Sequence, residues 1–192
     1  LIGSAATPGG LMVVKNNASP FVITHELGHS LGLGHTNLIR CPGNGPDGAW
    51  ANCNAIEYGG AVDVMSNVDI KGPLSTYHQW RMGIIKDADV TQVWKTQTID
   101  LKYTNATAGT RAIFVRDGKQ TYWIEYRKAA DGYTPGLAVY RTDPPPASSV
   151  VSPNPSDGVD APNEAVTSDV WLMNLDSFKY SSTATVSGSP IL

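Results

Sequence analysis

Three histidines and one glutamate stand at spacings that suit a metal centre. Residues 25–35 read His-Glu-Leu-Gly-His-Ser-Leu-Gly-Leu-Gly-His, which fills every fixed position of the pattern H-E-x-x-H-x-x-G-x-x-H. Residues four apart lie on the same face of an α-helix, so His25 and His29 would present two imidazoles to one point. Gly32 suits a left-handed helix end, after which the chain can turn and bring in His35 as a third ligand. Three nitrogen ligands that leave one position for water are typical of a catalytic zinc site.

Glu26 follows the first of these histidines, about a third of a turn round the helix. A carboxylate there can meet a water bound to the metal, whose pKa zinc lowers from about 15.7 to about 7. The carboxylate can then act as a general base while the water attacks a carbonyl carbon. The five-residue pattern alone recurs by chance, but the extended pattern with Gly32 and His35 is far more specific. The residues therefore predict one catalytic Zn²⁺ held by the three histidines, with Glu26 as the base.

The flanking residues support a helix that begins just before the motif. Ser19 supplies a hydroxyl for the N-cap, and Pro20 suits the first helical position. Five apolar side chains are expected to be buried on the sides of the helix that do not carry the histidines; they are Phe21, Val22, Ile23, Leu27 and Leu31.

Residues 23–33 closely resemble the metzincin zinc peptidases, and a second segment extends the likeness. Residues 58–67, Tyr-Gly-Gly-Ala-Val-Asp-Val-Met-Ser-Asn, are similar to the Met-turn that runs under the zinc site in that clan. The resemblance makes Met65 an apolar floor beneath the imidazoles. The alternative is an ordinary core methionine, since Met fills irregular gaps well.

Later stretches look like the gametolysin-like and immune inhibitor A-like peptidases. Residues 74–85 resemble the helix and the Gly-hydrophobic step that follow the Met-turn in those families, and residues 122–127 and 136–143 are weaker matches. The likeness implies an α+β fold. A catalytic portion, residues 1–86, would carry the zinc helix and the Met-turn, with the metzincin N-terminal sheet mostly absent. A β-rich C-terminal subdomain, residues 87–192, would follow.

The resemblance implies a secreted zinc-dependent endopeptidase, whose protein or peptide substrate lies extended across the site. Two alternatives stay open: a zinc-bearing domain that no longer cleaves and serves as a binding or structural module, and a zinc hydrolase that acts on a non-peptide amide. Glu26 argues against the module, because a purely structural zinc site has no use for a base beside an open coordination position.

The chain departs from the family pattern in two ways. Several metzincin families carry a tyrosine two places after the Met-turn methionine, where this chain has Asn67, so Tyr58 and Tyr77 become the candidates for a phenol that reaches the site. Metzincin domains also carry most of their sheet before the zinc helix, and here 24 residues precede His25. We therefore expect the chain to begin inside the domain, as a cleaved fragment, as one chain of a nicked enzyme with a separate N-terminal portion, or as a reduced version.

The two cysteines, Cys41 and Cys53, flank a Gly- and Pro-rich segment, residues 42–48, that cannot form a helix. A disulfide would close this loop and contribute on the order of 3 kcal/mol in the chain-entropy model. The alternative is two thiols or further zinc ligands, but three histidines are already assigned and the spacing is unlike that of a zinc knuckle. We expect the disulfide, and with it an oxidising, extracellular compartment.

Composition narrows the class of partner. The 192 residues fit one globular unit or two closely packed subdomains, and 41% hydrophobic residues support a core. Charged residues make up 16%, below the roughly 25% of average soluble domains. A formal net charge of −3 without a basic cluster offers no footprint for nucleic acid. We expect no membrane span, because no apolar run approaches about 18 residues, and a signal peptide of an exported form would already have been removed.

The remaining pattern predicts one more helix, near residues 74–82, and several strands. Residues 11–14 form a strand candidate that either pairs with an extended peptide or is an exposed terminal segment. Further strands are expected over residues 111–116, 121–127, 137–141 and 170–175, with a turn at Asp117-Gly118 and a looser alternation over residues 96–103. His78, the one histidine outside the motif, is expected to be a packed or hydrogen-bonded helix residue.

Overall fold

In the part of the chain that the structure describes, the main elements are one large mixed sheet and two helices. The structure, a computed structural model, describes residues 5–6, 10–16, 18–44, 47–60, 62–66, 72–128, 136–145, 150–151 and 169–173. The helices are α1 (Pro20–Ser30) and α2 (Thr76–Arg81), with 3₁₀ turns at Pro42–Asn44, Trp50–Asn52 and Asp87–Asp89. The strands are β1 (Ala5–Ala6), β2 (Met12–Val13), β3 (Thr36–Arg40), β4 (Asn54–Ile56), β5 (Val90–Val93), β6 (Ala112–Asp117), β7 (Gln120–Arg127), β8 (Gly136–Arg141), β9 (Val150–Val151) and β10 (Val170–Leu172).

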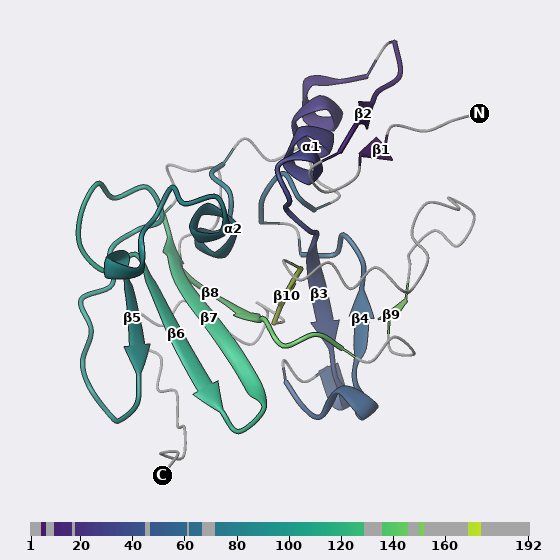
Figure 1. Cartoon of the computed structure of the whole chain (residues 1–192). Coiled ribbons are helices and arrows are strands. Elements are labelled where there is room, and N and C mark those ends of the chain that lie inside the picture. Colours follow the sequence, from purple (N-terminus) through teal and green to yellow (C-terminus); the bar gives the residue numbers. More distant parts are fainter. Residues whose placement is uncertain are drawn as a thin grey trace.

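Strand β10 joins the two parts of the large sheet. The strand order is β5-β6-β7-β8-β10-β3-β4-β9, and α1 stands beyond the upper end of β3 (Figure 1). β10 runs parallel to β3, with Val170 opposite Thr36, and antiparallel to β8, with Trp171 opposite Arg141. The fold is therefore α+β with a β-rich character, as the sequence predicts. The boundary after residue 86 stays a prediction, and the large sheet takes strands from both sides of it.

Helix α1 begins and ends where the sequence predicts. The Oγ of Ser19 accepts a hydrogen bond from the Val22 N–H at 3.3 Å, and Pro20 is the first helical residue. Gly32 follows the C-cap Leu31 with a φ of +87°, a conformation that glycine adopts without a steric penalty. This turn redirects the chain toward β3.

The outward face of α1 is less buried than the sequence predicts. Ile23, Leu27 and Leu31 are 40%, 46% and 55% exposed, and their spacing of four residues places them in one stripe. The prediction that these three are buried is wrong for the described part of the chain. Among the helices and strands, α1 packs chiefly against the small β1–β2 sheet, which does not cover this stripe.

Strand predictions succeeded where a local turn or a buried face specified them. β2, β6, β7, β8, β10 and helix α2 all overlap predicted elements, and Gly118, at a φ of +58°, turns β6 into β7. The alternation over residues 96–103 is not a strand, and Tyr103 makes only an isolated bridge to Tyr126. That prediction is wrong because residues 95–98 are all exposed, so the alternation has no face to bury. Five further strands lie outside the predicted elements: β1, β3, β4, β5 and β9.

Side chains on both faces of the sheet are buried. Tyr122 and Ile124 of β7 belong to one core cluster, and Trp123 between them belongs to the other, because side chains alternate across a strand. The second cluster includes Tyr77 of α2, whose ring centroid is 5.3 Å from that of Trp123. This contact packs α2 against the sheet.

Cys41 and Cys53 form a disulfide, as predicted. Cys41 follows the last residue of β3 and Cys53 precedes the first residue of β4, so the bond closes this antiparallel pair at the end away from His35. A disulfide indicates an oxidising environment. Within the described ranges, no helix is long and apolar enough to cross a membrane.

Candidate metal centre

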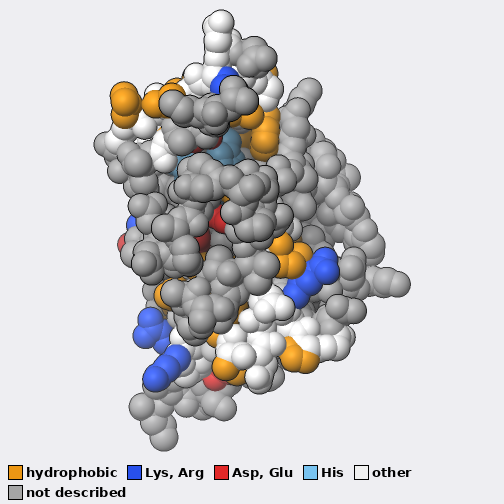
Figure 2. All heavy atoms as spheres, turned by 90° about the vertical axis from the view of Figure 1, so that its right-hand side faces the viewer, with side chains coloured by type: hydrophobic (Ala, Val, Ile, Leu, Met, Phe, Trp, Pro, Cys, Tyr) orange, Lys and Arg blue, Asp and Glu red, His pale blue; other side chains and the backbone are white. Residues whose placement is uncertain are grey.

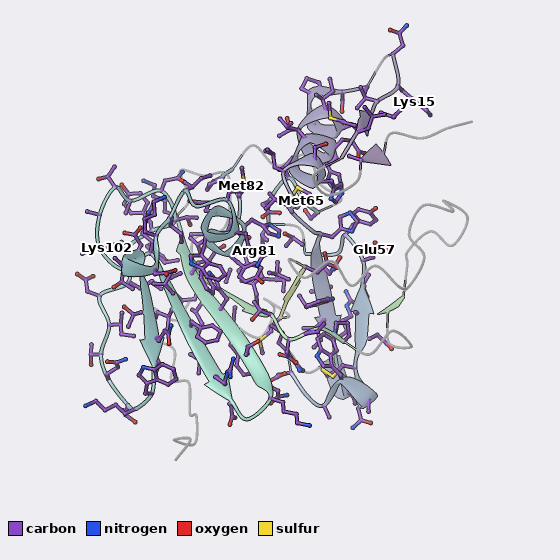
Figure 3. All side chains as sticks on the ribbon, viewed as in Figure 1. Lys15, Glu57, Met65, Arg81, Met82 and Lys102 are labelled. Carbon is purple, nitrogen blue, oxygen red and sulfur yellow. A yellow bond between two sulfur atoms is a disulfide. The ribbon has the colours of Figure 1, made fainter. Side chains whose placement is uncertain are left out.

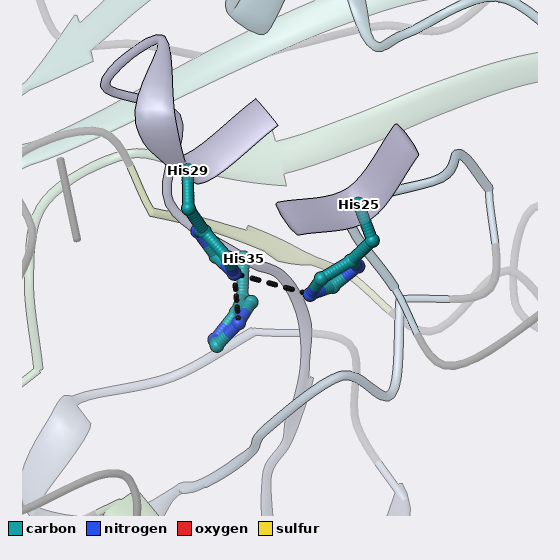
Figure 4. Close-up of side chains that lie close together, drawn as sticks. All are labelled: His25, His29 and His35. Atoms are coloured by element: carbon teal, nitrogen blue, oxygen red, sulfur yellow. Dashed lines mark hydrogen bonds between the residues drawn. The ribbon is translucent and has the colours of Figure 1, made fainter. Parts of the chain in front are cut away.

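The three histidines of the motif converge beside the end of α1. His25 and His29 lie on the helix, and His35 lies between the Gly32 turn and β3. The Nε2 atoms of His25 and His29 are 3.1 Å apart, and those of His29 and His35 are 3.0 Å apart (Figure 4). The structure thus brings the three predicted ligands together in a group that could hold a metal ion.

Backbone carbonyls orient the two histidines of the helix. The Nδ1 atom of His25 is 2.7 Å from the Val64 carbonyl oxygen, and that of His29 is 2.8 Å from the Leu33 carbonyl oxygen. A carbonyl can only accept a hydrogen bond, so in the neutral imidazoles the ring proton is on Nδ1. The Nε2 atoms are then unprotonated and face the centre.

Glu57 orients the third histidine. Its Oε1 is 3.1 Å from Nδ1 of His35, and both side chains are 10% exposed. A carboxylate that accepts this proton fixes the tautomer and makes Nε2 more basic, as around many metal-binding histidines. Three unprotonated nitrogens this close repel one another unless a cation lies between them. Tetrahedral zinc with Zn–N bonds of about 2.0–2.1 Å holds its ligand nitrogens about 3.3 Å apart, which is close to the Nε2 separations of 3.1 and 3.0 Å in this group.

His25 is kept neutral by its surroundings. Its pKa is lowered from 6.5 to about 4, first by burial and then by the charges of His35 and His29, while the hydrogen bond to Val64 opposes the change. At neutral pH the imidazole is therefore uncharged, with Nε2 unprotonated, which is the state that binds a metal ion.

Met65 lies directly under helix α1 (Figure 3). Its side chain is fully buried, and a Cβ added at Gly28 would lie 2.4 Å from the Met65 Sδ. The preceding residue, Val64, provides the carbonyl that holds His25. Asn67, which stands where some metzincins carry a tyrosine, lies outside the described residues.

Asp63 holds the Met65 segment from the inside. Its Oδ1 accepts hydrogen bonds from the Thr36 hydroxyl at 2.8 Å and the Met65 N–H at 3.0 Å, and its Oδ2 accepts one from the Ser75 N–H at 2.7 Å. Thr36 follows the third histidine, and Ser75 is the N-cap of α2. One buried carboxylate therefore ties together β3, the Met65 segment and α2.

The charge of Asp63 is stabilised by its neighbours. Burial opposes ionisation, but the hydrogen bond and charge of His78 and the charge of Arg127 outweigh it, so the pKa of Asp63 falls from 3.8 to about 2. The His78 Nδ1 is 3.4 Å from the Asp63 Oδ2, and both side chains are fully buried. His78 is thus a hydrogen-bonded helix residue, as predicted.

Tyr58 lies against the ligands, whereas Tyr77 packs into the core. The Tyr58 ring centroid is 4.0 Å from that of His35 and 5.8 Å from that of His25. Tyr58 is also the one non-glycine residue with a positive φ, +58°, in the described part of the chain. The Tyr77 ring packs on Trp123, and burial raises the pKa of its phenol.

The site reaches the molecular surface at the histidines. Figure 2 shows histidine surface near the top of the view, and it belongs to the ligand group because His78 has no exposure. His29 is half-buried, and Glu26, beside His25 on the helix, is 7% exposed. Glu26 is therefore buried, as is the neighbouring His25, and His29 is the most exposed of the three histidines.

Asp169 reaches the third histidine from the far end of the chain. Its Oδ1 accepts the His35 N–H at 2.7 Å, and its Oδ2 accepts a hydrogen bond from the Asn37 Nδ2 at 3.2 Å. Burial raises the pKa of Asp169 from 3.8 to about 7, and the Glu57 charge acts in the same direction, while the hydrogen bonds from His35 and Asn37 oppose it.

Sequence reasoning did not single out Glu57, Asp63 or Asp169. Asp63 carried a signal, since it is a lone charged residue between two valines in a segment expected to form an apolar floor. Glu57 stands just before the Tyr58-Gly-Gly turn, but nothing local assigns its partner. Asp169 has no local signal at all, because the backbone that it holds is 134 residues away.

No protein-family model, curated protein or solved structure matches this chain. Within the described ranges, the three histidines form the one group of three or more side chains with metal-binding atoms close together. A proposal for function therefore draws its support from this geometry and from the motif.

Proposed function

We propose that the chain is the zinc-bearing part of an endopeptidase that works outside the cell. The observation that carries the proposal is the convergence of three Nε2 atoms, each on a ring whose Nδ1 faces an oxygen acceptor. Three neutral imidazoles without a thiolate suit Zn²⁺ and leave a coordination position for chemistry. The disulfide supports an extracellular location, since such bonds persist in oxidising compartments.

Glu26 is the proposed general base. Bound zinc would supply a Lewis acid that polarises the scissile carbonyl and acidifies water. Glu26 adjoins His25 in α1, so its carboxylate starts from the same helical turn as a ligand. It would take the proton of the attacking water and pass it to the leaving amine, a role that contributes a factor of about 10²–10⁴ in rate.

Tyr58 is the proposed source of transition-state support. Its ring lies against His35, and the Asn37 Oδ1 accepts its backbone N–H at 2.9 Å, which secures the left-handed conformation. Strained conformations of this kind cluster at functional sites. Tyr58→Phe should lower kcat by about 10²-fold, the effect of removing one oxyanion donor, and leave zinc content unchanged. An unchanged kcat would exclude Tyr58 from this role.

The exposed stripe of α1 supports a partner on this side of the site. Ile23, Leu27 and Leu31 lie in line on the helix that carries two ligands, and aligned apolar side chains signal an interface more strongly than scattered ones. The proposed occupant is a separate N-terminal portion of the same domain. Leu27→Gln with Leu31→Gln should change the unfolding free energy of the chain alone by less than about 0.5 kcal/mol, yet weaken its association with that portion.

Metal analysis and peptide cleavage on one preparation test the proposal. The parent chain should retain about one zinc, and His29→Ala should lose it. Cleavage of a peptide mixture should stop when a chelator removes the metal and return with added zinc. Full zinc retention after replacement of all three histidines would refute the site. Zinc retention without any cleavage, also with the N-terminal portion present, would favour a binding module, and cleavage of small amides alone would favour an amide hydrolase.

A further inference from the structure

We propose that Asp169, the residue just before β10, is a positioning residue for the third histidine of the metal centre. This inference rests on the zinc site proposed above. If Asp169 has this role, β10 contributes to the support of that site. His35 is the one ligand that does not lie on α1, so another element must hold it in place.

β10 holds the backbone of His35 on both sides. The Asp169 carboxylate accepts the His35 N–H at 2.7 Å, and the Val170 N–H donates to the His35 carbonyl oxygen at 3.1 Å. Val170 is fully buried and pairs with Thr36, so this bonding continues directly into the sheet. His35 cannot rotate about its backbone without losing one of these hydrogen bonds. Asp169 and Val170 therefore fix the backbone from which the imidazole extends, and Glu57 holds the ring itself.

Gly34 is the residue that lets Asp169 come this close. A Cβ at Gly34 would lie 2.0 Å from the Asp169 Oδ1 and 2.8 Å from the Asp169 backbone nitrogen. The fixed glycine of the zinc motif is Gly32, and the place of Gly34 in that motif accepts any residue. The approach of Asp169 thus gives a reason for a second glycine that zinc binding alone does not require.

Asn37 holds the second oxygen of the Asp169 carboxylate and links it to Tyr58. Its Nδ2 donates to the Asp169 Oδ2 at 3.2 Å, and its Oδ1 accepts the Tyr58 N–H at 2.9 Å. Donors and acceptors therefore alternate from the His35 N–H to the Tyr58 N–H through one carboxylate and one amide. This series of hydrogen bonds joins His35 to Tyr58, whose ring lies against the His35 imidazole.

Exchanging the two side chains tests the role of Asp169. Asp169→Asn alone sets an NH₂ group against another donor, so either His35 or Asn37 loses its acceptor. Adding Asn37→Asp restores every hydrogen bond in reversed order, because the carboxylate now accepts from Tyr58 and from the new amide, whose oxygen accepts from His35. Asp89→Asn is the matched control: that carboxylate also accepts two hydrogen bonds, from Arg111 and Lys86, but it lies beside β5 at the far edge of the sheet.

Two readouts separate positioning from general stability: the zinc dissociation constant, measured against a chromophoric chelator, and the visible absorption spectrum of the Co²⁺-loaded protein. Asp169→Asn should weaken zinc binding about 10–100-fold and alter the cobalt spectrum. The exchange variant should recover most of the affinity and the parental spectrum. Asp89→Asn should change neither readout, whatever it does to the melting temperature.

Parental affinity and spectrum in Asp169→Asn would overturn the inference, and so would a folded exchange variant that binds zinc as weakly as the single variant. Should Asp169→Asn fail to fold, the exchange variant decides: recovery of folding and zinc affinity supports the role, and no recovery overturns it. A parent chain that binds no zinc would instead refute the proposed zinc site.

Discussion

Gly28→Ala should damage the metal centre more than it damages the fold. Gly28 lies on α1 between His25 and His29, and an added Cβ would be 2.4 Å from the Met65 Sδ and 3.0 Å from its Cε. Ordinary contact begins at 3.4 Å, so one of the two must move by roughly 1 Å. Because the Met65 side chain is fully buried, it has little room to give way, so we expect α1 to take up part of the movement.

Two opposing effects set the change in stability. Alanine is favoured over glycine inside a helix by about 0.5–1 kcal/mol, whereas overpacking costs about 1–3 kcal/mol. The net loss should be about 1 kcal/mol, which lowers the melting temperature of a chain of this size by about 2–4 °C. Zinc–ligand distances in well-formed sites lie within about 0.2 Å of their standard values. A helix shift of a few tenths of an ångström should therefore weaken zinc binding about 10–100-fold, as changes around the ligands do.

The assay is zinc competition against a chelator, with a thermal melt of the metal-free protein alongside. Gly136→Ala is the control, because an added Cβ there meets nothing within 4 Å. Adding Met65→Ala to Gly28→Ala should remove the clash and return part of the lost affinity, so that the two changes are coupled. Parental zinc affinity and melting temperature in Gly28→Ala would refute the idea that Met65 supports the ligand-bearing helix.

Three further predictions follow from the site and its surroundings. As the pH falls from 6.5 to 4, the metal-free protein should lose stability relative to His25→Gln, because His25 is neutral when folded and takes up a proton on unfolding; at about 1.36 kcal/mol per pKa unit the difference between the two proteins changes by an amount on the order of 3 kcal/mol, and an equal pH dependence in both would contradict it. Asp169, whose pKa is raised to about 7, acts in the opposite direction in both proteins and therefore does not enter the difference. Replacing Cys41 and Cys53 by serine should lower the free energy of unfolding in urea by about 3 kcal/mol, and an unchanged value would mean that the bond does not constrain the unfolded chain. Glu57→Ala should weaken zinc binding about 10–100-fold with an unchanged circular dichroism spectrum, and parental affinity would show that His35 does not depend on it.

The ligand-bearing helix could be predicted because everything that defines it is local. The N-cap Ser19, Pro20 and the glycine turn at Gly32 all lie within a few residues of the histidines, and each has the predicted geometry. The same holds for the hairpin at Gly118, whose two strands meet across a tight turn. Patterns of this kind depend on backbone preferences and spacing, which the sequence states directly.

The residues that support the ligands could not be predicted in the same way. Glu57 and Asp169 reach His35 only because β4 pairs with β3 and because β10 is inserted between β3 and β8. That strand order is a property of the folded sheet, and no periodic pattern in the sequence indicates it. The burial of an apolar helix face could not be predicted either. Helical spacing identifies the stripe that contains Leu27, but it does not say whether another part of the molecule covers that stripe.

Hydrolysis of a peptide by the zinc-loaded parent and by Glu26→Gln tests the central proposal most directly. The substitution keeps the size of the side chain and removes the base, and it leaves all three histidines in place to bind zinc. At equal zinc content, kcat/KM should fall by at least about 10²–10⁴-fold, equivalent to roughly 3–5 kcal/mol of barrier. Cleavage by Glu26→Gln at the parental rate would contradict the proposed mechanism.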